Sequence, residues 1–312
     1  MKIALYGSIA WRHPFGFRQV IDWAKQFGWD CVDARGMCIG IPGDPCNYLD
    51  AFGYDMLGPR QIRPSARVDL HHVLKEAGTP LCGIYCSSPL NLPGEQGKRY
   101  RQLFCEYLEL GVDLEAEWVR PIYNTQATYQ GPEMSRQEAY ERITEGAREV
   151  GLLAAEIGIG LLFENNENTV HANAAELLQL QRDVSDVCRV GIAYDPVNAY
   201  FQGNDPQQEL DALRGQIDVL HVKNVRRVAR FQDGYMPRGE HHYAWTTLSD
   251  GDLDWRQLIP RAAQDGFDGT IVFEYVNPFK GMPLSYWNTI REPPVAAHEE
   301  AEYLRSILNL LD

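Results

Sequence analysis

The chain has 312 residues, a formal net charge of −14 and 45% hydrophobic residues, which is enough apolar material for a large core. The acidic balance argues against partners that select basic patches, namely nucleic acids and anionic membranes. The opening MKIALYGSI predicts a strand rather than a signal peptide, and the most apolar window, 150–163, is too short to span a bilayer. The seven cysteines show no paired framework, so we expect a cytoplasmic protein.

Strand-like and helix-like stretches alternate along the whole chain. The predicted strands cover 2–7, 31–35, 80–86, 117–123, 160–165, 189–195, 218–224 and 269–275. The predicted helices cover 17–28, 68–78, 98–114, 135–158, 172–184, 206–214, 255–265 and 296–311. Eight strands, each followed by a helix, predict an α/β protein with a (β/α)8 TIM-barrel fold, as a single domain over 1–312. A doubly wound open sheet is the alternative, but no Gly-x-Gly-x-x-Gly motif follows any of these strands.

Three long insertions interrupt this pattern, at about 36–66, 225–250 and 276–294. Each follows the carboxyl end of a predicted strand, which is the active-site face of a barrel. Each is rich in aromatic residues, Gly and Pro, so we expect the insertions to wall a deep pocket. Surface elaboration or a contact in an oligomer is the alternative interpretation.

Four neighbouring predicted strands carry a metal-competent side chain at the same end, namely Glu164, Asp195, His221 and Glu274. Taken singly, each could be a solvated loop residue, but in a barrel the four strand ends converge. Crowded carboxylates repel one another, and a divalent cation removes that penalty. Oxygen ligands with one imidazole favour Mn²⁺, while Mg²⁺, Co²⁺ and Zn²⁺ are also compatible.

The stretch VLHVKN (219–224) places His221 and Lys223 two residues apart, on one face of a strand that is otherwise buried. Burying both is unfavourable unless each has a partner. We predict that His221 binds the metal, and that Lys223 contacts substrate oxygens or a metal-bound carboxylate. A salt bridge that closes the barrel mouth is the alternative role for Lys223.

These stretches resemble the xylose-isomerase-like TIM barrels, a superfamily of sugar isomerases, ketose epimerases, polyol dehydratases and a repair endonuclease. The resemblance lies in 161–180, 192–210, 219–225 and 248–275, and it covers roughly the C-terminal half. It implies a metal-dependent isomerase or epimerase that acts on a sugar, keto-sugar or polyol through an enediolate. Glu164 and Glu274 would exchange the proton, with Lys223 as a third catalytic residue.

The resemblance leaves other functions open. A lyase would use the same enediolate to eliminate a β-substituent, for example in dehydration or in cleavage of a 3-keto-glycoside. The repair endonuclease would need more histidine ligands and a basic face, and a non-catalytic barrel would not need the four ligands. We therefore expect a small carbohydrate substrate and no nucleic acid, and by analogy a homo-oligomer.

The predicted substrate-binding residues follow from their positions near strand ends: Trp11, His13, Tyr85, Asn124, Asn198 and Arg227. Asn198 stands where the epimerases and some dehydratases usually carry a histidine, and Asn224 stands where an acidic residue is common. An asparagine can hold a hydroxyl group but cannot transfer protons. Arg227 or its neighbour Arg226 would bind a hydroxyl, carboxylate or phosphate, and we favour Arg227.

Overall fold

The structure is a computed structural model of the 312-residue chain. It describes residues 1–10, 16–36, 57–60, 62–86, 88–121, 134–166, 169–229, 236–238, 241–276 and 290–311. Most of the predicted insertions at 36–66 and 276–294 lie outside the described residues.

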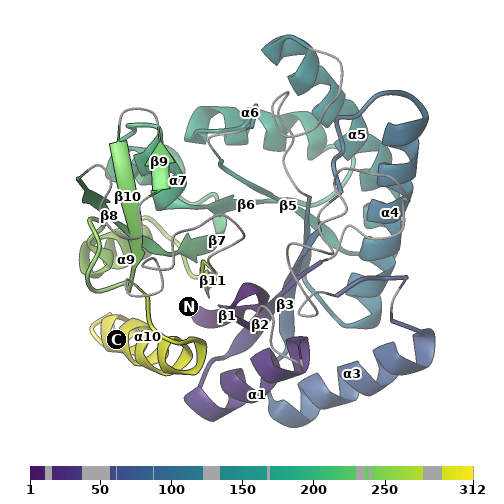
Figure 1. The fold of residues 1–312 in the computed structure, drawn as a ribbon. Helices are drawn as coiled ribbons and strands as arrows, with labels where there is room; N and C mark the ends of the chain where they lie inside the picture. The colour runs from purple at the N-terminus through teal and green to yellow at the C-terminus, as the bar shows by residue number, and fades with distance from the viewer. Residues whose placement is uncertain are drawn as a thin grey trace.

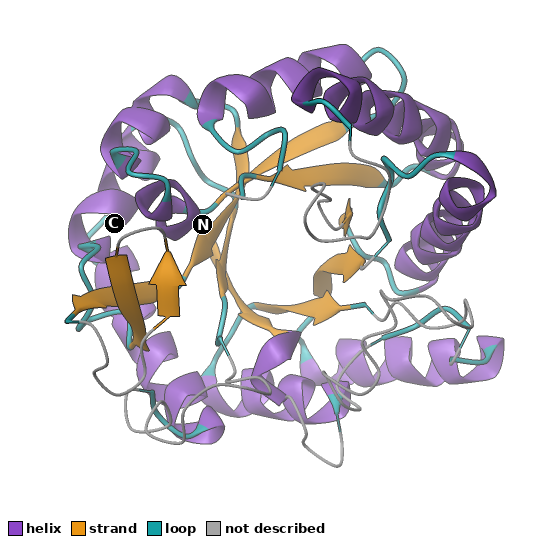
Figure 2. Ribbon diagram, turned by 45° about the horizontal axis from the view of Figure 1, so that its top comes forward, coloured by secondary structure: helices purple, strands orange, loops and turns teal. Residues whose placement is uncertain are grey.

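Eight parallel strands close into a barrel in the order β1-β11-β7-β6-β5-β4-β3-β2, with β2 pairing back onto β1 (Figures 1 and 2). The prediction of a (β/α)8 barrel is therefore confirmed. The strands are β1 Lys2–Tyr6, β2 Cys31–Arg35, β3 Leu81–Cys86, β4 Trp118–Pro121, β5 Gly160–Glu164, β6 Val190–Tyr194, β7 Ile217–Val222 and β11 Thr270–Phe273. Each lies within the stretch predicted for it or within one residue of it.

Helices surround the barrel on its outer face (Figure 2). They are η1 Gly7–Ala10, α1 Phe17–Phe27, α3 Pro64–Ala77, α4 Gly94–Asp113, α5 Arg136–Ile157, α6 Ala174–Val184, α7 Pro196–Phe201, α8 Pro206–Ala212, α9 Trp255–Gln264 and α10 Pro293–Leu308. The short elements η1 and α7 were not predicted from the sequence. None of the helices within the described ranges is long and apolar enough to cross a membrane.

Alternation along the strands separates two hydrophobic regions. Residues such as Ile3, Leu5 and Val32 pack outward against the helices in the larger core. The intervening residues face the barrel interior, where a smaller cluster contains Tyr6 and Trp118. The interior therefore has an apolar floor, and its polar side chains gather at the carboxyl ends of the strands.

Trp118 fills the floor of the barrel because two glycines leave room for its ring. A Cβ atom at Gly160 would lie 2.4 Å from the indole, and one at Gly191 would lie 2.7 Å from it. The Arg189 guanidinium stacks on the ring at 4.0 Å from its centroid. The two glycines are thus required by packing at the barrel floor.

Part of the insertion predicted at 225–250 forms a separate three-stranded antiparallel sheet, in the order β8-β10-β9, beside the barrel (Figure 1). Its strands are β8 Asn224–Val228, β9 Met236–Arg238 and β10 His241–Thr246. The sheet was not predicted. The Tyr243 ring of β10 packs edge-on against Phe201 at 5.0 Å between centroids, which attaches the sheet to α7.

Asn224 connects this sheet to the segment before α9. Its amide Nδ2 donates hydrogen bonds to the carbonyl oxygens of Leu248 and Leu253, at 2.7 and 2.9 Å. Its Oδ1 accepts hydrogen bonds from the backbone N–H groups of Val225 and Leu253. Gly251 lies so close that a Cβ atom there would be 2.0 Å from the Asn224 side chain. The side chain therefore serves the fold here, with its amide committed to backbone groups.

The Gly160→Ala variant should lower the free energy of unfolding by about 1–3 kcal/mol, because the added methyl group overpacks the Trp118 ring. Urea denaturation, followed by circular dichroism, measures the change. In a Trp118→Leu background the same methyl group should be tolerated, which gives a favourable coupling energy in a double-mutant cycle. An equal cost in both backgrounds would show that the indole ring is not the constraint.

Candidate functional site

Four metal-competent side chains meet at the mouth of the barrel, and we call them the carboxylate–histidine cluster: Glu164, Asp195, His221 and Glu274. Glu164 ends β5, His221 lies on β7, and Glu274 follows β11 directly. Asp195 follows β6 and caps α7, where its Oδ1 accepts the backbone N–H groups of Val197 and Asn198. The predicted convergence of these strand ends is observed.

The cluster is compact. One donor atom each from Glu164, Asp195 and His221 lies within 4.8 Å of the others, and all three residues are buried. His221 Nδ1 is 3.6 Å from Glu164 Oε1 and 3.8 Å from Glu274 Oε2. Glu274 is less deeply buried and borders the triad, so its role as the fourth ligand stays a prediction.

Lys223 lies beside the cluster and is 8% exposed. Its ammonium donates a hydrogen bond to Glu274 Oε2 at 2.8 Å and forms an ion pair with Asp195 Oδ2 at 2.8 Å. Burial alone would lower the pKa of Lys223, but the surrounding carboxylates raise it well above its ordinary value. The lysine is therefore a fixed positive charge, and it has the partners that its burial requires.

Burial and neighbouring charges shift the pKa values of the cluster residues in different directions. Burial raises the pKa of Glu164 to about 8, although Arg120 opposes this, and burial also raises the pKa of Asp195. For Glu274 burial acts upward, but the charge of Lys223 and the contact with His221 bring the pKa well below its ordinary value. Burial and the charge of Arg120 lower the pKa of His221 to about 3. The imidazole is therefore neutral, which is the form that binds metals.

The residues present fit a divalent metal. They offer carboxylate oxygens and a neutral imidazole from three or four strand ends, and hard divalent cations favour such an oxygen-rich set. Ligands that bind an ion at about 2.1 Å lie within roughly 4 Å of one another. Small side-chain adjustments would therefore close the 4.8 Å cluster around one ion.

Arg120 on β4 also belongs to the site, although the sequence analysis gave it no role. Its Nη1 lies 2.6 Å from Glu164 Oε2 and 2.7 Å from His221 Nε2, with the side chain 4% exposed. The rings of Tyr6 and Tyr85 flank the guanidinium, at 5.7 and 4.8 Å from their centroids. A charged residue inside the predicted strand EWVRPIY could have indicated this role. A polar residue inside a buried strand was also the feature that identified His221.

Asp33 on β2 is a second interior residue that the sequence analysis did not select. It is 3% exposed, and its Oδ1 has no hydrogen-bond partner among the described residues. Burial raises its pKa to about 6, and the charge of Arg120 opposes this shift. Its carboxylate lies inside the apolar predicted strand CVDAR, and this feature could have identified it from the sequence.

Of the predicted substrate-binding residues that the structure describes, Asn198 contacts the cluster directly. It is buried on α7, and its Nδ2 donates to the Asn165 carbonyl at 2.8 Å and to Glu164 Oε1 at 3.4 Å. Tyr85 faces the interior beside Arg120. Arg227 is exposed on β8, where its guanidinium contacts His241 and its backbone N–H donates to Asp252.

Three more predicted residues, Trp11, His13 and Asn124, lie outside the described residues. The substrate-binding roles of all six residues therefore stay predictions.

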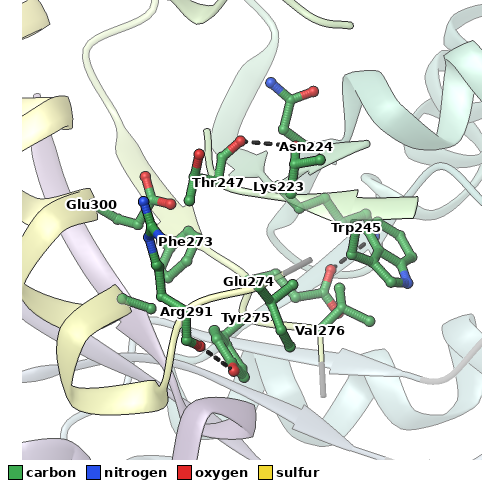
Figure 3. Close-up of a pocket in the computed structure, with 13 residues that line it drawn as sticks. Lys223, Asn224, Trp245, Thr247, Phe273, Glu274, Tyr275, Val276, Arg291 and Glu300 are labelled. Atoms are coloured by element: carbon green, nitrogen blue, oxygen red, sulfur yellow. Dashed lines mark hydrogen bonds and ion pairs between the residues drawn. The ribbon is translucent and has the colours of Figure 1, made fainter. Parts of the chain in front are cut away.

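A pocket opens next to the cluster, between the end of β11, strand β10 and helix α10 (Figure 3). The empty space there, which includes open solvent at its mouth, is about 350 Å³. Lys223 and Glu274 contribute to its lining, together with Trp245 of β10, whose ring centroid is 5.6 Å from the lysine ammonium. Glu300 of α10 borders the other side, and its Oε1 accepts the Leu248 N–H at 3.0 Å.

Residues 21–307 match the model of the family described as "Xylose isomerase-like TIM barrel". The match covers most of the chain, so the chain belongs to this family, as the resemblance predicted. Among curated proteins, an inosose dehydratase from Clostridium perfringens is 23% identical over 184 residues, which is 57% of this chain and 59% of that protein. The chain thus matches about three fifths of that relative's length.

Two solved structures share the fold over almost their whole length. A D-psicose 3-epimerase, solved in the presence of D-fructose, has a TM-score of 0.71 at 12% identity, and the match covers 99% of both chains. The IolI protein, solved with a zinc atom, has a TM-score of 0.68 at 13% identity, and the match covers 97% of this chain and 96% of that one. At these identities the likeness shows the common fold.

The Glu300→Gln variant should be more stable than the unaltered protein at pH 8, by on the order of 2 kcal/mol. Burial raises the pKa of Glu300 to about 8, against an ordinary value of 4.5. Between these values the folded state binds the extra proton, so its stability falls as the pH rises through that window.

Glutamine keeps an oxygen for the Leu248 N–H without the charge, and urea denaturation at pH 5 and pH 8 measures the effect. Glu156→Gln, at an exposed position on α5, is the control. An equal stability change at both pH values would contradict the prediction.

Proposed function

We propose that this protein is a divalent-metal-dependent isomerase or epimerase that acts on a sugar, keto-sugar or polyol. The observation that carries the proposal is the gathering of Glu164, Asp195 and His221 within 4.8 Å at the barrel mouth. Family membership supports it, and so does the shared fold of a D-psicose 3-epimerase.

The residues that would hold the ion are Glu164, Asp195, His221 and Glu274. A divalent ion at this place would act as a Lewis acid that polarises a carbonyl group and makes the neighbouring C–H more acidic. Manganese is our first choice because three carboxylates and one imidazole form an oxygen-rich set. The zinc atom in the IolI structure supports a divalent ion in general rather than manganese in particular.

Glu164 and Glu274 are our candidates for proton transfer. Both carboxylates lie near His221 Nδ1, at 3.6 and 3.8 Å. Removing a proton from one face of a carbon and returning it to the other requires two groups on opposite sides of the substrate. The Lys223 ammonium keeps Glu274 ionised and able to accept a proton. Asn198 Nδ2 donates a hydrogen bond to Glu164 Oε1 and so helps to orient that carboxyl group.

Lys223 has two roles in this scheme. Its ion pairs with Asp195 and Glu274 fix the orientation of both carboxylates. The same ammonium lines the pocket, so it can also donate a hydrogen bond to a substrate oxygen.

A lyase is the second candidate, and a specific observation favours it: a matched curated protein is an inosose dehydratase. After the same proton abstraction, a β-hydroxyl group would leave with a proton from a nearby acid. Glu274, protonated by the first step, would supply that proton. Lys223 would donate a hydrogen bond to the departing oxygen, because it faces the pocket beside Glu274.

The Glu274→Gln variant should lose turnover by about 10²- to 10⁴-fold and bind metal more weakly, because it removes a base and a ligand together. Elemental analysis of protein purified without chelator should find about one divalent ion per chain in the unaltered protein. Ketoses, inososes and keto-glycosides are then screened for solvent deuterium uptake next to the carbonyl. Deuterium exchange without loss of water indicates an epimerase or isomerase, and new unsaturation indicates a lyase.

Glu156→Gln, at an exposed position on α5, is the matched control and should keep both metal and activity. Circular dichroism checks that both variants are folded. Absence of metal even after soaking with Mn²⁺, or full activity in Glu274→Gln, would overturn the proposed function.

A further inference from the structure

The contact between Arg120 and His221 fixes the proton on the imidazole ring. A guanidinium is always protonated and can only donate hydrogen bonds. Its Nη1 lies 2.7 Å from His221 Nε2, so this ring nitrogen must be the acceptor. The proton of the neutral ring is then on Nδ1, which faces the carboxylate oxygens of Glu164 and Glu274.

A metal-bound histidine is incompatible with this contact. A neutral imidazole that binds a metal through one nitrogen carries its proton on the other. If Nε2 binds the ion, its lone pair is no longer available to Arg120. If Nδ1 binds the ion, Nε2 carries a proton that would face the guanidinium N–H at 2.7 Å. Either way, Arg120 loses its acceptor on His221.

The barrel interior holds another carboxylate that can receive the guanidinium. Asp33 is buried, and its Oδ1 has no hydrogen-bond partner among the described residues. It faces the same interior: Tyr6, whose ring flanks Arg120, is its register partner on β1. Asp33 also feels the charge of Arg120. A buried carboxylate without a full set of partners is costly, and a guanidinium would remove that cost.

We propose that a divalent cation displaces the Arg120 side chain when it binds. In the metal-free protein Arg120 donates hydrogen bonds to His221 and Glu164, and in the metal-bound protein its guanidinium pairs with Asp33 instead. This proposal rests on the metal site of the proposed function. In the metal-free protein, Arg120 supplies the positive charge that the cluster needs. Metal binding then replaces one cation with another, so metal affinity is lower than the ligand set alone would give.

The first test follows the His221 ring by ¹⁵N NMR in the unaltered chain, with Mg²⁺ as the probe because it is diamagnetic. The His221 signals are the ones lost in His221→Asn. The metal-free protein should show a proton on Nδ1 and an accepting Nε2. Saturation with Mg²⁺ should remove that acceptor signature and shift the Arg120 side-chain resonance. The test needs no Arg120 variant, so it holds even if such a variant fails to fold.

The second test measures Mn²⁺ affinity by isothermal titration calorimetry. Arg120→Met should bind Mn²⁺ about tenfold or more tightly, because the competing cation is absent. Asp33→Asn should bind about tenfold more weakly, because the displaced guanidinium loses its carboxylate. Arg182→Met, at an exposed position on α6, is the matched control and should leave the affinity unchanged.

The outcomes separate this proposal from the proposed function. Mg²⁺ binding with an unchanged His221 tautomer and unchanged Arg120 resonance would overturn the displacement alone. Equal or weaker Mn²⁺ binding in Arg120→Met would do the same. Failure of both the unaltered protein and Arg120→Met to take up metal would overturn the metal site together with the displacement.

Discussion

Carboxylates project into one end of the barrel from four different strands or strand ends, and three of the four are buried. They belong to Asp33, Glu164, Asp195 and Glu274. Each would be unfavourable there as an isolated charge. The chain meets this constraint with buried cations rather than by exposing the acids. The fold of the mouth therefore depends on how positive charge is distributed among the carboxylates.

Two cations divide this task. Lys223 lies between Asp195 and Glu274, and Arg120 reaches across the interior to Glu164 and His221. Neither cation could be replaced by an apolar residue without leaving a buried carboxylate uncompensated. Lys223 also keeps Glu274 ionised, whereas burial raises the pKa of Glu164 although Arg120 and Lys223 oppose that shift. Neighbouring carboxylates with separated pKa values are a common basis for acid and base roles.

The sequence predicted the barrel well because its signals are local. Each apolar run of strand length is followed by an amphipathic helix, and the observed strands lie within about one residue of the predicted runs. The cluster was predictable for a similar reason: polar residues such as His221 and Glu274 stand where buried strands end. The parallel order of the strands then brings those ends together.

The features that were missed depend on contacts between distant residues. Arg120 and His221 are 101 residues apart, and no local pattern joins them. The β8-β10-β9 sheet forms inside a stretch rich in Gly and aromatic residues, where pairing decides the structure rather than propensity. Asn224 directly follows Lys223, so strand alternation already turned it away from the cluster. Its partners, the carbonyl oxygens of Leu248 and Leu253, are distant in sequence, so only the folded structure shows them.

That asparagine has a consequence for how the protein could be re-engineered. Because Asn224 ties the base of β8 to the loop before α9, and its neighbour is Lys223, the sheet and the charged mouth share one anchor. Exchanging the outer strand β9 and its connections would leave this anchor intact. Exchanging the whole insertion at 225–250 would remove the Leu248 partner of Asn224 and leave only its contacts with Leu253. The three-stranded sheet can thus serve as a replaceable module only down to the joint at Asn224.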